Sequence, residues 1–168
     1  MLDLKDLTGG SRHRKAGTMK QEFFLDWSPD ARDHAALLQR LVGGNLTRGG
    51  PSGHRNMAVM LRDPDTGDVV SGVWGVILYG WLNVEMIYVD EPDRRQGLGS
   101  RLLASVEDAA RKQGCIGSWL IAYGFQPAGF YEKNGYRQFG ELDALPPTSS
   151  DSTDRRALFY RKSFPNAG

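Results

Sequence analysis

The feature of this sequence that most restricts its fold is a strand that runs, through a short charged segment with two glycines, into an amphipathic helix. Residues 86–89 read Met-Ile-Tyr-Val, and residues 94–100 read Arg-Arg-Gln-Gly-Leu-Gly-Ser. Beyond them, apolar residues recur at the spacing of one helix face and charged residues at the opposite face, until Gly114 ends the run. This order predicts a helix that crosses over to a parallel strand.

The two glycines of this turn, Gly97 and Gly99, indicate a site for phosphate groups. The first backbone N–H groups of a helix lack intrahelical partners and carry partial positive charge, and a turn without β-carbons lets phosphate oxygens approach them. Two other phosphate-binding motifs do not fit. The turn lacks the Gly-Lys-Ser/Thr of a nucleotide-triphosphate loop, and Leu102 replaces the third glycine of a dinucleotide fingerprint. Taken alone, the glycines also fit a tight turn that binds nothing.

Runs of β-branched and aromatic residues on both sides of the turn predict a sheet. Ser28, followed by Pro29, predicts the start of an N-terminal helix, and Gly43 and Gly44 predict its end. Consecutive strands favour antiparallel pairing, whereas the strands on either side of the long helix should be parallel. The sequence thus predicts a single α/β (α+β) domain with a mixed, mostly antiparallel sheet and flanking helices. The predicted strands are residues 23–27, 57–61, 69–78, 81–89, 118–123, 136–141 and 157–164, with a short helix at 126–136.

Composition excludes several classes of function. The 168 residues contain 21 Lys and Arg against 20 Asp and Glu, so a net charge of +1 gives no general basic field for nucleic acid or an anionic membrane. The single cysteine, Cys115, allows no intrachain disulfide and no cysteine-cluster metal site. The first residues lack the apolar segment of a signal peptide, and the uncharged run at residues 69–84 is shorter than the ~20 residues of a membrane-spanning helix. We therefore expect a cytoplasmic protein without a metal ion.

The turn and the segments after it resemble the GNAT superfamily of acetyl-CoA-dependent N-acetyltransferases. The loop signature of that family is Gln or Arg, two variable residues, Gly, one variable residue, then Gly or Ala; Arg94, Gly97 and Gly99 match it. Residues 130–136, Phe-Tyr-Glu-Lys-Asn-Gly-Tyr, closely resemble the family's later helical segment. The resemblance covers about residues 21–164, which we expect to form the N-acetyltransferase domain. A mobile leader at residues 1–20 and a tail at residues 165–168 are expected to flank it.

The resemblance implies acetyl-CoA as cosubstrate and no metal. It places the cofactor where the two parallel strands splay apart, with the pantetheine arm along the backbone of residues 87–89. The diphosphate is expected on the backbone amides of residues 96–100. The residues expected to bind the cofactor are Ile87, Tyr88, Val89, Arg94, Arg95, Gln96, Gly97, Leu98, Gly99, Ser100, Gln126, Phe130 and Lys133.

Two side chains, Tyr131 and Glu85, are candidates for the chemistry of acetyl transfer. In the family, the tyrosine that matches Tyr131 commonly protonates the departing thiolate, and a phenol with a pKa of about 10 stays protonated at neutral pH. Glu85 is our first candidate for the general base, because strand alternation places it on the side of Ile87 and Val89 unless a bulge intervenes. The position of the glutamate in histone-acetylating relatives falls on Asn83, which cannot act as a base. A water chain, no protein base, or a purely structural ion pair at Glu85 are the alternatives.

Together these features predict an N-acetyltransferase that transfers an acetyl group from acetyl-CoA to a primary amine of a small molecule. Fold alone does not select the acceptor. The alternatives are a catalytically silent acyl-CoA-binding module and an acetyltransferase that acts on a protein or a charged tRNA. The expected partner is a small-molecule amine, without membrane or nucleic acid, and a homodimer stays open.

Overall fold

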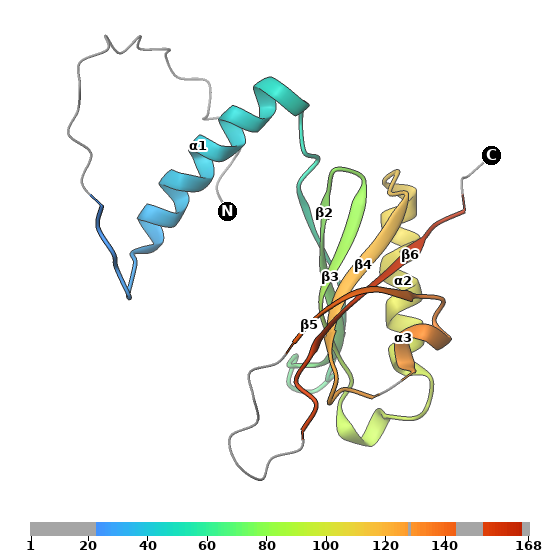
Figure 1. Ribbon diagram of the computed structural model, residues 1–168. Coiled ribbons are helices and arrows are strands. Elements are labelled where there is room, and N and C mark those ends of the chain that lie inside the picture. The colour runs from blue at the N-terminus through green and yellow to red at the C-terminus, as the bar shows by residue number, and fades with distance from the viewer. Residues whose placement is uncertain (1–22, 128, 144–152, 166–168) are drawn as a thin grey trace, which may run out of the picture. The chain divides into compact units, whose positions relative to one another are not determined.

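A six-stranded mixed sheet forms the centre of the unit Leu41–Gly168 (Figure 1). The structure, a computed structural model, describes residues 23–127, 129–143 and 153–165. The strand order is β1-β2-β3-β4-β6-β5; β3 and β4 are parallel, and the other neighbouring pairs are antiparallel. The strands are β1 (Arg55–Arg62), β2 (Val69–Leu78), β3 (Trp81–Tyr88), β4 (Gly117–Tyr123), β5 (Arg137–Leu142) and β6 (Ala157–Ser163).

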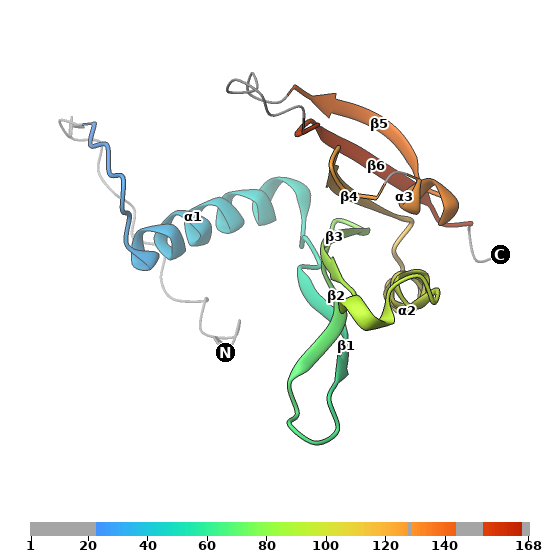
Figure 2. The same ribbon diagram turned by 90° about the horizontal axis from the view of Figure 1, so that it is seen from below.

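Two helices lie on one face of this sheet (Figures 1 and 2). Helix α2 (Leu98–Lys112) follows a single 3-10 turn, η2 (Glu91–Asp93), and contacts β1, β2 and β3. Its apolar stripe faces the strands, so burial of this stripe explains why the amphipathic pattern forms a helix here. Helix α3 (Phe130–Lys133) is one turn long. The core consists of Val73, Ile77, Leu82, Val84, Leu102, Leu103, Val106, Ala110, Cys115, Leu120, Ala122, Tyr136, Tyr160 and Phe164.

A buried polar cluster ties α2 to the strands β4 and β6. Glu107, on α2, is only 2% exposed, and its Oε2 lies 2.5 Å from Lys162 Nζ. The Tyr136 hydroxyl donates to Glu107 Oε1 at 2.8 Å and lies 2.9 Å from Ser118 Oγ. Since a buried carboxylate is costly without partners, these contacts fix the position of the helix relative to the sheet. Desolvation and the Glu107 charge raise the pKa of Tyr136 far above its usual value.

The structure before the sheet differs from the prediction in two respects: residues 23–27 form no strand, and the first helix begins later than expected. The chain divides into two units, Met1–Arg40 and Leu41–Gly168. Residues 23–27, predicted as a strand, form none, because a strand needs a pairing partner and the described residues provide none for this segment. Helix α1 (Ala31–Gly49) begins after Asp30, whose Oδ1 accepts a bond from Arg32 N at 2.8 Å. The cap is therefore Asp30 and not Ser28.

The predicted end of this helix was also wrong. Helix α1 continues through Gly43 and Gly44, and the Thr47 hydroxyl donates to the Gly43 carbonyl at 2.8 Å. A glycine weakens a helix, but it ends one only where it adopts the left-handed conformation, as Gly50 does with a φ of 73°. All residues of α1 are exposed.

The predicted fold class is confirmed. Strands β1 to β6 begin and end within two residues of the predicted bounds, and the parallel contact between β3 and β4 forms as expected. The helix predicted at residues 126–136 is shorter, because Gly129 has a φ of 77° and the helix starts only after it. The predicted leader at residues 1–20 and most of the tail lie outside the described residues. None of the helices in the described part of the chain is long and apolar enough to cross a membrane.

Candidate active site

The parallel strands β3 and β4 separate over half of their length. Their pairing joins residues 81–84 to residues 117–120, and β3 then continues to Tyr88 without a further β4 partner. A cavity of about 340 Å³, here called the splay cavity, opens beyond the last pair. It is lined by Val84, Glu85, Met86, Ile87, Tyr88, Ile121, Gln126 and Tyr131. The separation predicted from the family resemblance is therefore present.

A β-bulge at Glu85 contributes to this geometry. Gly75 of β2 pairs with Val84, but its neighbour Trp74 pairs with Met86, so Glu85 is the extra residue on β3. The bulge breaks the expected alternation: Ile87 packs against the core, whereas Glu85 is exposed. The side that simple alternation assigned to Glu85 was therefore wrong, although its side chain still lines the splay cavity.

The glycine turn lies between η2 and α2. Gly97 has a φ of 78°, and its carbonyl accepts the first helical bond, from Arg101 N at 3.1 Å. The N–H groups of Leu98, Gly99 and Ser100 precede that bond, so they are available to an anion. Apart from its two chain neighbours, no described residue has an atom within 4 Å of the place where a Cβ of Gly97 would stand.

The side chains of the turn mostly hold the turn itself. Arg94 Nε donates to the Val89 carbonyl at 2.9 Å, and its guanidinium stands 5.9 Å from the centre of the Tyr88 ring. Gln96 Nε2 donates to the Pro92 carbonyl at 3.0 Å.

At Gly99, close packing of another side chain favours glycine. A Cβ at this position would stand 3.2 Å from two ring atoms of Phe130. Phe130 thus rests directly on the first turn of α2, and its ring makes an edge contact with Tyr131 at 5.0 Å between centroids. Lys133, at the other end of α3, is exposed and lies outside the lining of the splay cavity.

Tyr131 is brought to the splay cavity by α3. Its ring is half-buried against Tyr160 and Tyr136, with centroid separations of 5.6 Å and 6.1 Å. Burial raises the pKa of Tyr131 above its usual value, so the phenol keeps its proton at neutral pH. Gln126 borders the same cavity, and its Oε1 accepts a bond from Tyr123 N at 3.0 Å.

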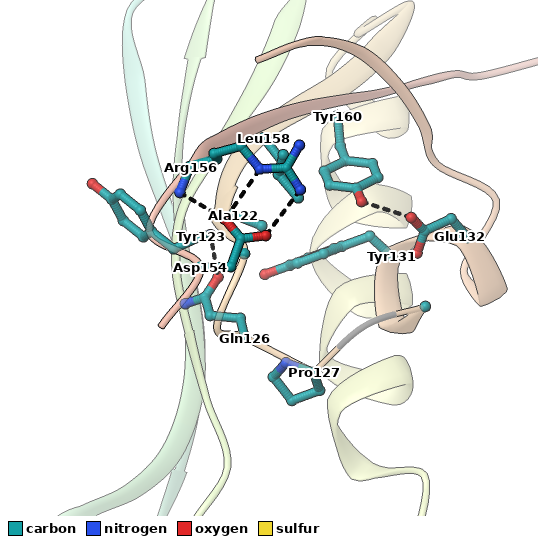
Figure 3. Close-up of a pocket in the computed structure, with 12 residues that line it drawn as sticks. Ala122, Tyr123, Gln126, Pro127, Tyr131, Glu132, Asp154, Arg156, Leu158 and Tyr160 are labelled. Atoms are coloured by element: carbon teal, nitrogen blue, oxygen red, sulfur yellow. Dashed lines mark hydrogen bonds and ion pairs between the residues drawn. The ribbon is translucent and has the colours of Figure 1, made fainter. Parts of the chain in front are cut away.

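Tyr131 and Gln126 also border a second cavity of about 210 Å³, here called the Asp154 cavity. Figure 3 shows the Tyr131 hydroxyl and the Asp154 carboxylate pointing into it. Arg156 donates to Asp154 from Nε at 3.1 Å and from Nη2 at 2.9 Å, and these bonds hold the pKa of Asp154 below its usual value.

Tyr160 donates to Glu132 Oε1 across the same cavity at 2.6 Å. The hydrogen bond to this carboxylate raises the pKa of Tyr160 to about 12. Sequence patterns gave no indication of Glu132, Asp154, Arg156 and Tyr160 as site residues. Pairing of β6 with β4 brings the last three to Tyr131, and only a pairing register could have revealed this.

Comparison with known proteins agrees with this geometry. Residues 53–138 match the family described as Acetyltransferase (GNAT) domain. Acetyltransferase Atu2258 of Agrobacterium fabrum is 35% identical over 123 residues, which are 73% of this chain and 89% of that protein. Blasticidin-S acetyltransferase of Streptomyces morookaense is 40% identical over 84 residues, 49% of this chain and 62% of that protein.

Solved structures show the same fold. A crystal structure of an acetyltransferase from Agrobacterium tumefaciens superposes with a TM-score of 0.77 and 32% sequence identity, over 86% of this chain and all of that one. An acetyltransferase from Bacillus cereus superposes with a TM-score of 0.67 over 84% of this chain and 98% of that one, at 22% identity. Because a family match over half of the chain, a relative of similar length and a sheet that splays at β3 and β4 all agree, this chain belongs to the GNAT family of acetyltransferases and is an acyltransferase.

Proposed function

We propose that this acetyltransferase transfers the acetyl group of acetyl-CoA to a primary amine of a small molecule. The observation that carries the proposal is the position of Tyr131, whose side chain borders both the splay cavity and the Asp154 cavity. A thioester in the first and an amine entering from the second meet at its hydroxyl. The similarity to Blasticidin-S acetyltransferase, a protein named for a small-molecule acceptor, supports the acceptor class.

The residues around α2 and β3 fit acetyl-CoA, which supplies an acetyl group activated as a thioester. The open space beside Gly97 and the free N–H groups of the first turn suit a diphosphate. Arg95 adds a positive charge beside this turn. Beyond the last β3–β4 pair, the backbone of Ile87, Tyr88 and Val89 can pair with the extended pantetheine arm as an added strand would.

Tyr131 and Glu85 divide the proton transfers between them. As the new N–C bond forms and the C–S bond breaks, the amine loses a proton to Glu85, and Tyr131 Oη gives a proton to the departing sulfur. Glu85 suits this role because it lines the splay cavity together with Tyr131. Its carboxylate is exposed, so water can carry the proton onward.

Release of free thiol from acetyl-CoA in a screen of primary amines tests the function. We expect thiol release with small amines and none with N-terminal peptides or lysine peptides. Glu85→Gln should lower kcat by about 10²- to 10⁴-fold, because the amine then lacks its proton acceptor. Glu91→Gln, an exposed acid in η2, is the matched control and should retain kcat. Thiol release with peptides alone would contradict the proposed acceptor class.

A further inference from the structure

The Asp154 cavity contains charged groups that the reaction itself does not need. Its lining includes Glu132, Asp154 and Arg156. The proposed proton transfers, in contrast, require only Tyr131 as the donor and Glu85, in the splay cavity, as the acceptor. The Arg156 guanidinium is shared, because its Nη1 also contacts Glu141 Oε2 at 3.3 Å. Within the lining, one guanidinium faces two carboxylates, Asp154 and Glu132, so one negative charge remains.

The Asp154 carboxylate is placed against the end of β4 by the absence of a side chain at Gly124. A Cβ on Gly124 would overlap the carboxyl group of Asp154, so only glycine admits this position. Gly124 N donates to the Arg156 carbonyl at 3.0 Å, which fixes the segment that carries Asp154 against β4. The carboxylate is therefore positioned by Gly124 at the end of β4 and by the hydrogen bonds from Arg156.

Asp154 retains capacity for a further donor. Its Oδ1 accepts from Arg156 N at 3.1 Å and from Nε, whereas its Oδ2 accepts only from Nη2 among the described residues. A carboxylate oxygen accepts two hydrogen bonds, so Oδ2 can take one more. Figure 3 shows this carboxylate facing the side of the cavity where the Tyr131 hydroxyl lies.

We propose that the Asp154 cavity holds a second cationic group of the acceptor, an ammonium or a guanidinium, while the primary amine to be acetylated lies at Tyr131. The inference rests on the proposed function, since it specifies the acceptor of the same site. A single amine does not serve both places, because the attacking nitrogen must be neutral whereas Asp154 favours a cation. The acceptors selected are therefore amines with at least one further positive charge.

Asp154 is suited to binding a cation and not to removing a proton. The bonds from Arg156 lower the pKa of Asp154, which makes the carboxylate a weaker base than an ordinary one. A weak base that stays ionised across neutral pH leaves the bound group protonated. Asp154 is therefore a specificity residue, and its loss should change acceptor choice more than the chemical step.

Paired acceptors test the inference: alkylamines of four to eight carbons and the α,ω-diamines of the same lengths, measured by thiol release. The quantity compared is the ratio of kcat/KM for the diamine to that for the monoamine, halved because a diamine has two reactive ends. Asp154→Asn keeps the shape of the side chain but removes the charge. We expect it to lower this ratio roughly three- to tenfold, through KM.

Three controls make the result specific. Asp65→Asn removes one negative charge from the exposed turn between β1 and β2, and the ratio should stay unchanged. Gly124→Ala should lower the ratio as Asp154→Asn does, because its methyl group displaces the carboxylate. High salt should lower the ratio in the unaltered protein but not in Asp154→Asn. The salt arm needs no variant, so it stays informative if a variant fails to fold.

The outcomes separate this inference from the proposed function. The inference is overturned if the ratio is the same in the unaltered protein and in Asp154→Asn and does not change with salt. In that case, thiol release with both series of amines still supports the proposed function. Absence of thiol release with every amine of both series contradicts the proposed acceptor class itself.

Discussion

At the residue scale, the hydroxyl of Tyr131 is the group on which the proposed chemistry depends. Tyr131→Phe removes the proton donor but keeps the ring that packs against Tyr160 and Tyr136. We therefore expect kcat to fall by about 10²- to 10⁴-fold, with the Kd for CoA unchanged by calorimetry. Tyr79→Phe, at an exposed tyrosine in the turn between β2 and β3 that lines neither cavity, is the control. Unchanged kcat in Tyr131→Phe would exclude this tyrosine as the acid.

The pH dependence of the reaction follows from the same residue. Burial raises the pKa of Tyr131, so its proton is retained up to pH values above the usual pKa of about 10. The acceptor amine, in contrast, becomes reactive as it loses its proton. We expect kcat/KM to rise from pH 7 to pH values near 9.5 without a descending limb. A descending limb with an apparent pKa below 9 would contradict the role of Tyr131 as the acid.

At the scale of elements, the turn before α2 can be tested with two matched glycines. Gly97 and Gly80 both have a positive φ, 78° and 76°. Apart from chain neighbours, no described residue has an atom within 4 Å of a Cβ position at either glycine. Leucine at either place should cost about 1–2 kcal/mol of backbone strain. Only Gly97→Leu should weaken CoA binding, since Gly80 lies in the turn between β2 and β3. Equal calorimetric affinities of the two variants would argue against the diphosphate site.

The attachment of α2 to the sheet depends on the ion pair of Glu107 and Lys162. Lys162→Met leaves a carboxylate that is nearly inaccessible without its counter-charge. We expect the free energy of unfolding to fall by about 3 kcal/mol in urea titrations. Lys112→Met, an exposed lysine at the end of α2, should change it by less than about 0.5 kcal/mol. Adding Glu107→Gln to Lys162→Met should restore part of the loss.

At the scale of the whole molecule, binding of CoA should stabilise the folded chain. A ligand at 100 times its Kd adds about 2.7 kcal/mol to the free energy of unfolding, which for a chain of this size raises Tm by roughly 5–11 °C. Thermal unfolding of the unaltered protein should show this rise with CoA. Gly97→Leu should show a much smaller one at the same CoA concentration. An identical rise in both would place the ligand away from the turn.

The sheet was predictable because each strand from β1 onward carries its own apolar pattern. The parallel pairing of β3 with β4 followed from the long helix between them, whereas the position of β6 between β4 and β5 was not predicted. The bulge at Glu85 was not predictable, since an inserted residue changes which partners face each other without changing the composition of the strand. The segment at residues 23–27 shows the converse, because its composition favours a strand but pairing decides whether one forms.

The candidate site was predictable only where it is local. The glycine turn and Tyr131 lie in short segments with recognisable residues, so their positions on the sheet follow from the chain order. Asp154 and Arg156 reach Tyr131 through the pairing of β6 with β4, and Gly124 admits them by a contact that no pattern encodes. Long-range pairing therefore builds the part of the site that we propose selects the acceptor.

The contact between Gly99 and Phe130 joins two parts of the protein that have separate tasks. A methyl group on the first turn of α2 would require the Phe130 ring to move by a few tenths of an ångström, so that turn and the single-turn helix α3 are in close contact. We therefore expect an anion bound at the turn to press on the Phe130 ring, and through it on Tyr131, which follows directly in the sequence. The candidate proton donor would then register the arrival of the cosubstrate through one aromatic ring.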